Sequence, residues 1–127
     1  MVIKCIEDGR LALVISGKLN ADNASEVGQE MIQDIKISNP KEMILDFSDL
    51  TYISSMGLRE LLKVKKMFPH LPTYIIEASK DISDIFDVTG FSDYFVIYKK
   101  GEVFGSKSNH LFERDIKSST IKLAYFN

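Results

Sequence analysis

The sequence has one cysteine and no long apolar segment. Cys5 has no partner for an internal disulfide, and a lone cysteine is typical of proteins in a reducing cytoplasm. No apolar run approaches the roughly 20 residues that a membrane-spanning helix needs. The first residues also lack the basic region and apolar core of a signal peptide. We therefore expect a cytoplasmic protein that does not insert into a membrane.

An excess of charge of one sign is also lacking. The chain of 127 residues carries 16 Lys and Arg against 18 Asp and Glu, which gives a formal net charge of -2. Domains that bind nucleic acid show a basic patch or stripe, so we expect no nucleic-acid partner. The lysines are interspersed with acidic residues, which argues against a patch that binds a membrane surface.

Motifs for metal binding and for common enzymatic reactions are missing. His70 and His110 lie far apart with no cysteine nearby, so no metal site is expected. The chain has no Gly-x-Ser-x-Gly motif of a serine hydrolase and no Gly-x-x-x-x-Gly-Lys loop for nucleotide phosphates. Asp46 and Asp49 could pair, but no third ligand or base accompanies them. We expect a protein that is not an enzyme and has no cofactor.

The pattern of apolar residues predicts one α/β domain, and 45% apolar content suits a globular chain. Asp8-Gly9 between two β-branched and aliphatic runs is a strong signal for a β-hairpin. The predicted elements are strands at residues 2–6 and 11–15, a helix at 24–38, a strand at 43–47, a helix from Met56, a strand at 73–76, a helix at 81–88 and a strand at 94–98. Alternating strands and helices imply parallel pairing, so we expect a small mixed β-sheet with an N-terminal antiparallel hairpin and flanking helices.

Several side chains have predicted local roles. Asn20, Asp22 and Asn23 all suit a helix N-cap, and Asn23 comes closest to a capping box because Glu26 follows three residues later. Ser79 and Gly90 are expected to begin and end the third helix. Lys65 falls inside the apolar stripe of its helix, so its ammonium group must reach solvent or a partner. Four aromatic residues are expected to pack on strands, namely Tyr52, Tyr74, Tyr94 and Tyr98.

Residues 1–100 form the predicted domain, and residues 101–127 form a C-terminal extension. Ile121, Leu123 and Tyr125 alternate with other residues as in a strand. Two interpretations stay open for the extension. It folds back onto the domain, or it is an exposed segment that pairs with another chain.

Two adjacent serines, Ser54 and Ser55, lie where the strand at 43–47 and its turn lead into the helix from Met56. The first amides of a helix have no partner within the helix and carry a partial positive charge. A serine there can cap the helix, and a phosphate there is favoured electrostatically. The residues alone leave two readings open: a cap only, or a cap together with a phosphorylated switch.

The same stretch resembles the signature of STAS domains, which occur in anti-sigma factor antagonists and in the tails of sulphate transporters. The resemblance rests on residues 43–50 followed by residues 52–58. Weaker similarity lies in residues 17–20 with Ala24, and in residues 87–91. It covers roughly residues 1–98 and leaves out the extension.

The resemblance implies a regulatory role in binding another protein. In antagonists of the family, the partner anti-sigma factor is a serine kinase that phosphorylates the serine two places before the Gly-Leu pair. That serine is Ser55 here. Ser54 stands where aspartate is common, and Met56 stands where serine or threonine is common. A serine phosphatase that reverses the modification is a second implied partner.

We expect the kinase partner to bind at the start of the helix and along its exposed side. The predicted contact residues are Ser54, Ser55, Met56, Gly57, Arg59 and Lys63. Gly57 would permit close approach of a partner, and the cations would make contacts at the rim. The alternative is a non-phosphorylated STAS subunit of a transporter or lipid-trafficking assembly, which Ser54 and Met56 make credible. An enzyme that acts through Ser55 would need a nearby base, and the sequence offers no obvious one.

Overall fold

The computed structural model describes residues 2–105, and it begins with the predicted hairpin. β1 (Val2–Glu7) pairs antiparallel with β2 (Arg10–Ile15), in register Glu7 with Arg10. The turn has positive φ at both central residues, 52° at Asp8 and 78° at Gly9. This conformation matches the right-handed twist of the two strands, so the Asp-Gly prediction is confirmed.

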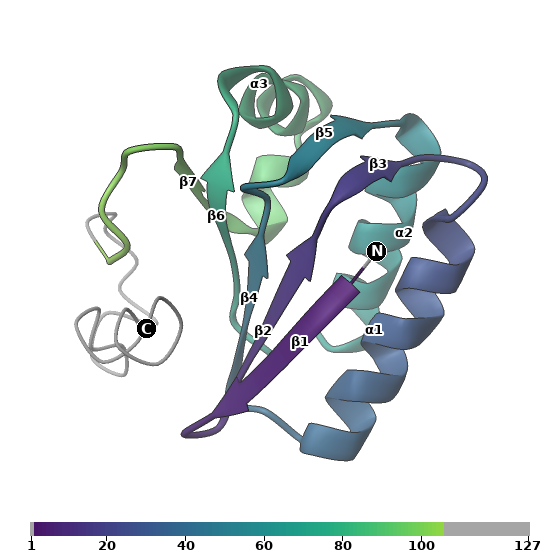
Figure 1. Ribbon diagram of the computed structural model, residues 1–127, viewed down its shortest axis with the longest axis vertical. Helices are drawn as coiled ribbons and strands as arrows, with labels where there is room; N and C mark the ends of the chain where they lie inside the picture. Colours follow the sequence, from purple (N-terminus) through teal and green to yellow (C-terminus); the bar gives the residue numbers. More distant parts are fainter. Residues whose placement is uncertain (1, 106–127) are drawn as a thin grey trace.

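A five-stranded mixed sheet forms the centre of the molecule, in the order β1-β2-β4-β6-β7 (Figure 1). β4 (Glu42–Asp46), β6 (Thr73–Ala78) and β7 (Val96–Lys99) run parallel to β2. Leu13, Leu45, Ile75 and Ile97 face one another across these four strands and are almost completely buried. Every residue of β4 is buried, as its continuous apolar run predicts for a central strand.

Three helices cover one face of this sheet: α1 (Ala24–Ser38), α2 (Ser55–Met67) and α3 (Lys80–Thr89). A short 3-10 helix, η1 (Phe91–Tyr94), follows α3. The apolar sides of the helices and the inner face of the sheet form one core. The predicted fold class is confirmed, and the helix and strand boundaries agree with the prediction to within about two residues.

The caps of the helices agree with the sequence at α3 and differ at α1. The Ser79 hydroxyl accepts a hydrogen bond from the Ile82 amide at 3.2 Å, and Gly90 ends α3 with φ 79°. Asn23 precedes α1, but its side chain makes no capping bond. It accepts instead from the Asn20 amide and donates to the Lys18 carbonyl. Asn23 therefore shapes the loop before α1, which corrects the capping-box prediction.

Lys65 lies in the apolar stripe of α2, and its ammonium group binds the loop that follows the helix. Nζ donates to the Leu71 carbonyl at 2.6 Å and to the Pro69 carbonyl at 3.4 Å. Partial burial lowers the pKa of the Lys65 ammonium, because desolvation disfavours its charge. The side chain thus ties the end of α2 to the start of β6.

The four tyrosines differ in burial. Tyr74 and Tyr98 are buried on the outer face of the sheet, as predicted. Tyr52 is 50% exposed on its strand, and Tyr94 is 44% exposed in η1 with the Lys66 ammonium 5.7 Å from its ring centre. The prediction that all four pack on strands is therefore wrong for Tyr94 and incomplete for Tyr52.

The chain after β7 returns over the outer face of the sheet. Phe104 is buried, with its ring centre 5.3 Å from that of Tyr74 and 5.1 Å from that of Tyr98. Residues 106–127 lie outside the described residues. The alternation of Ile121, Leu123 and Tyr125, and the choice between the two interpretations of the extension, fall there and stay predictions.

We predict that Lys65→Met lowers the free energy of unfolding by about 1–2 kcal/mol, because two carbonyl acceptors lose a charged donor. Urea denaturation of the full chain measures this change. Lys80→Met is the matched control, since it removes an ion pair with Asp84 that is exposed at both ends and should cost little stability. Equal losses in the two variants would contradict the structural role of Lys65.

Candidate functional site

A second, two-stranded sheet holds the start of α2 in place. β3 (Gly17–Leu19) pairs parallel with β5 (Leu50–Ile53), and Lys18 faces Tyr52. The Thr51 hydroxyl also donates to the Gly17 carbonyl at 3.0 Å. The strands predicted from the sequence include neither residues 17–19 nor residues 50–53, so this pairing was not predicted. The small sheet brings the loop before α1 and the start of α2 to one end of the molecule (Figure 1).

Ser54 is the N-cap of α2. Its backbone is extended, with φ -93° and ψ 172°, and its hydroxyl accepts a hydrogen bond from the Gly57 amide at 3.2 Å. Its own amide donates to the Leu19 carbonyl at 2.9 Å. Ser54 therefore satisfies one free amide of the helix and joins α2 to β3.

Ser55 is the first residue of α2, and it is exposed. Within residues 2–105 its hydroxyl makes no hydrogen bond to a carboxylate or an imidazole. The two serines thus have different positions. One completes the helix end, and the other presents its hydroxyl to solvent at the positive end of the helix dipole.

Gly57 allows α2 to approach β3 closely. A Cβ placed on Gly57 would lie 2.7 Å from the Leu19 carbonyl oxygen and 2.9 Å from Leu19 Cγ. The residue is buried, so the close approach that it permits is one within this chain. The predicted reason for this glycine was the approach of a partner, and the contact with Leu19 is a reason within the chain itself.

Exposed apolar and basic side chains surround Ser55. Met56 is 46% exposed and Tyr52 is 50% exposed. Arg59 and Lys63 are exposed one and two turns further along α2, where residues three or four apart share a face. The Lys63 ammonium lies 3.6 Å from Glu60 Oε1. Tyr52 is the residue that the sequence analysis missed. The sequence gives no signal for it, because Leu50, Tyr52 and Ile53 all suit a buried strand, whereas the structure buries Leu50 and Ile53 and exposes Tyr52.

The carboxylates near this end have structural roles. Asp46 is buried at the end of β4, and its Oδ1 accepts from the Ser48 amide at 2.7 Å, as expected for a turn. Asp49 lies exposed in the same turn. Among residues 2–105, no three His, Cys, Asp or Glu side chains come close enough together to hold a metal ion.

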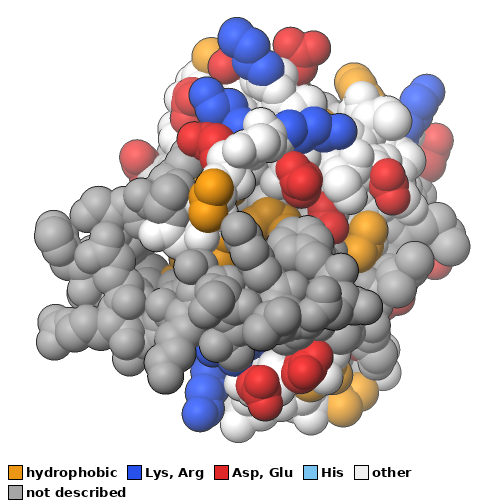
Figure 2. Space-filling model, turned by 60° about the vertical axis from the view of Figure 1, so that its left-hand side comes forward, with side chains coloured by type: hydrophobic (Ala, Val, Ile, Leu, Met, Phe, Trp, Pro, Cys, Tyr) orange, Lys and Arg blue, Asp and Glu red, His pale blue; other side chains and the backbone are white. Residues whose placement is uncertain are grey.

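Charged side chains of both signs occur on the surface of the molecule (Figure 2). Basic and acidic side chains are interspersed on the face shown in Figure 2. Among the helices described, none combines the length and the apolar character that a membrane span requires.

Comparison with known proteins identifies the family. The family model described as "STAS domain" matches residues 2–104, which is most of the chain. The chain belongs to the STAS domain family. The resemblance seen at residues 43–58 is thereby confirmed.

Individual STAS proteins are similar over most of this chain. The protein named "Putative anti-sigma factor antagonist BtrV", from Bordetella bronchiseptica, is 28% identical over 97 residues, covering 75% of this chain and 83% of its own. The fold of the Thermotoga maritima protein TM1081 matches with a TM-score of 0.71 at 15% identity, over 97% of this chain and 93% of that one. The Bacillus protein SpoIIAA, solved in its phosphorylated form, matches with a TM-score of 0.60 at 13% identity, over 79% and 93%.

We predict unequal losses of stability when each of the two serines is replaced by alanine. Ser54→Ala removes the cap and should lower the free energy of unfolding by about 1 kcal/mol. Ser55→Ala changes an exposed side chain and should alter it by less than about 0.5 kcal/mol. Denaturant titrations of both variants measure the difference. A larger loss in Ser55→Ala would mean that the cap has been assigned to the wrong serine.

We also predict that Gly57→Ala destabilises the fold by roughly 1–2 kcal/mol, because the added methyl group meets a backbone carbonyl that cannot rotate away. Gly28→Ala in α1 is the matched control. The obstacle there is the Glu60 side chain from Cγ to Oε1, which can turn about its own bonds, as a backbone carbonyl cannot. Thermal unfolding should show the smaller change for Gly28→Ala, and the reverse order would refute the tight contact between Gly57 and Leu19.

Proposed function

We propose that this protein is an anti-sigma factor antagonist, a regulatory binding protein and not an enzyme. It binds a partner anti-sigma factor at the start of α2, and that partner is a serine kinase which phosphorylates Ser55. The observation that carries the proposal is the exposed hydroxyl of Ser55 beside a cap that Ser54 already provides. The name of the similar protein BtrV supports an anti-sigma factor as the partner, and the phosphorylated form of SpoIIAA supports control by phosphorylation.

The helix end can accept a phosphate without losing its structure. A phosphoserine adds a charge of about -1.5 to -2 at neutral pH. The positive end of a helix dipole stabilises a nearby anion by about 0.3–1 kcal/mol at an exposed site. The Ser54 hydroxyl keeps its bond to the Gly57 amide, because the modified hydroxyl is a different one. The modified chain therefore stays folded.

A bound partner responds differently to the phosphate. Tyr52 and Met56 present half-exposed apolar surface on either side of Ser55 in the sequence, which is the kind of surface that an interface core covers. A phosphate buried there without matching cations loses its hydration and gains little in return. Phosphorylation of Ser55 therefore releases the partner while the antagonist keeps its fold.

The predicted contact residues divide into two groups. Ser54 is half-buried and caps α2, and Gly57 is buried against Leu19, so these two residues set the shape of the surface. Cations at the rim of an interface raise the association rate more than the affinity. We assign direct contact with the partner to the exposed residues Tyr52, Ser55, Met56, Arg59 and Lys63.

A reversible switch also needs a reaction that removes the phosphate. We propose that a serine phosphatase removes the phosphate from Ser55 and restores binding. An exposed residue at the first position of a helix is accessible to such an enzyme. We propose that the cycle takes place in the cytoplasm, a reducing compartment that suits a chain with the lone Cys5.

We predict that Ser55→Asp weakens capture of the kinase partner from cells of the native organism by about tenfold or more, because a charge enters the contact surface. Wild-type chain and Ser55→Ala should capture it equally. Incubation with the captured kinase and ATP, followed by mass spectrometry, should place one phosphate on Ser55 in wild-type chain and in Ser54→Ala.

The outcomes separate the proposal from its alternative. Phosphate on another residue, or unchanged capture by Ser55→Asp, would refute the switch. Capture of a membrane transporter with no kinase would favour a non-phosphorylated STAS subunit of a larger assembly.

A further inference from the structure

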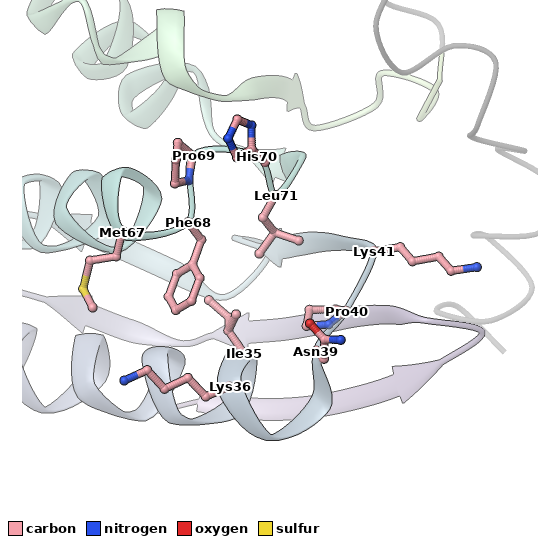
Figure 3. A pocket seen from close by; sticks show the side chains of 10 residues that line it. All are labelled: Ile35, Lys36, Asn39, Pro40, Lys41, Met67, Phe68, Pro69, His70 and Leu71. Carbon is pink, nitrogen blue, oxygen red and sulfur yellow. The ribbon is translucent and has the colours of Figure 1, made fainter.

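The C-terminal ends of α1 and α2 form a groove at the opposite end of the helices from Ser55. We call it the α1–α2 groove. Its volume is about 520 Å³. Its floor consists of Ile35 from α1 and of Phe68 and Leu71, which follow α2, and Figure 3 shows these three side chains converging. Met67 stands at the rim and is 46% exposed. The groove is large enough for a bulky side chain with its flanking backbone.

The charge around the groove is positive. Lys36 and Lys41 line it, and its ten lining residues, all within the described part of the chain, include no acid. Two helix ends contribute about half a negative charge each. Lys36 lies in the last turn of α1, and Lys65 and Lys66 lie in the last turn of α2, so cations offset both helix ends. With Lys41 added and no acid among its lining residues, the groove keeps a net positive charge.

The two lysines stand at opposite sides of the apolar floor. In Figure 3 Lys36 and Lys41 extend away from the floor in opposite directions. The Lys41 amide donates to the Gly9 carbonyl at 2.6 Å, which fixes the backbone from which that side chain extends. A ligand that complements this arrangement has an apolar group in the middle and negative charge on both sides.

The shape of the groove distinguishes a peptide from a small molecule. Most of its lining residues are exposed, and of the floor Ile35 and Leu71 are buried. Small-molecule sites usually enclose most of the ligand surface, which an open groove cannot do. A peptide needs such a pocket for only one of its apolar side chains. The peptide residues on either side can then lie at the polar rim of the groove.

We propose that the α1–α2 groove binds an acidic peptide segment of a partner protein, with one bulky apolar side chain over Ile35, Phe68 and Leu71. Acidic residues on either side of that side chain pair with Lys36 and Lys41. α2 has 13 residues, and at 1.5 Å per residue the groove lies about 18 Å along the helix from Ser55. A partner held here is not displaced by a phosphate on Ser55, so the groove acts independently of the proposed switch.

The test uses the full chain and a short synthetic peptide with one phenylalanine between two runs of glutamate. In two-dimensional amide NMR, this peptide should shift the signals of Ile35, Met67, Phe68 and Leu71. A peptide with glycine in place of the phenylalanine, and one with lysines in place of the glutamates, should each bind at least about tenfold more weakly. Added salt should weaken binding of the acidic peptide.

Matched variants test the charges. Lys36→Gln combined with Lys41→Gln should weaken the acidic peptide about tenfold, whereas Lys18→Gln combined with Lys99→Gln makes the same change in net charge elsewhere and should leave the affinity unchanged. Ser55→Asp should also leave it unchanged.

Three results would overturn the proposal. They are unshifted groove signals at millimolar peptide, equal binding of the lysine-flanked peptide, and equal weakening in the two pairs of lysine variants. Groove signals that shift on dilution of the protein alone would assign the surface to a second copy of this chain.

Discussion

The contact between α2 and β3 is the constraint on which the rest of this end of the molecule depends. Gly57 lies against the Leu19 carbonyl, which leaves no space for a Cβ, and Ser54 bonds Leu19 through its amide. These two contacts determine how closely the first turn of α2 packs against β3. Since Ser54 is held at the contact, the next residue, Ser55, comes first in the helix and faces solvent. A packing requirement inside the chain thus determines which hydroxyl is presented outside.

The two ends of α2 offer different chemistry to other proteins. Its N-terminus combines free amides, a partial positive charge and the exposed Ser55 hydroxyl, and this combination suits an anion that comes and goes. At its C-terminus, Lys65 satisfies loop carbonyls, and an apolar floor lies open between Lys36 and Lys41. Phosphorylation, which adds charge covalently, is suited to control binding at the N-terminus of α2. The residues that line the groove at the second end carry no hydroxyl group, so the binding proposed there would depend on partner concentration and salt.

Local signals made much of the fold predictable. The positive φ of Asp8 and Gly9, the cap at Ser79 and the continuous burial of β4 each follow from residues close in the sequence. The β3–β5 sheet could not be foreseen, because β3 has three residues and pairs with a strand more than thirty positions away. Sequence alone placed a serine pair at the helix start. The division of roles within the pair depends on a one-residue difference in where the helix begins, which packing against Leu19 decides.

The central claim is that Ser55 can carry a phosphate while the fold stays intact. Phosphoserine inserted at position 55 during synthesis of the full chain tests it without any partner. Hydrogen exchange and thermal unfolding are compared with those of the unmodified chain. The account predicts a melting temperature within about 5 °C, since the dipole effect is at most about 1 kcal/mol. Changes in amide protection should be confined to the start of α2. Loss of protection across β3 and β5, or loss of cooperative unfolding, would contradict it.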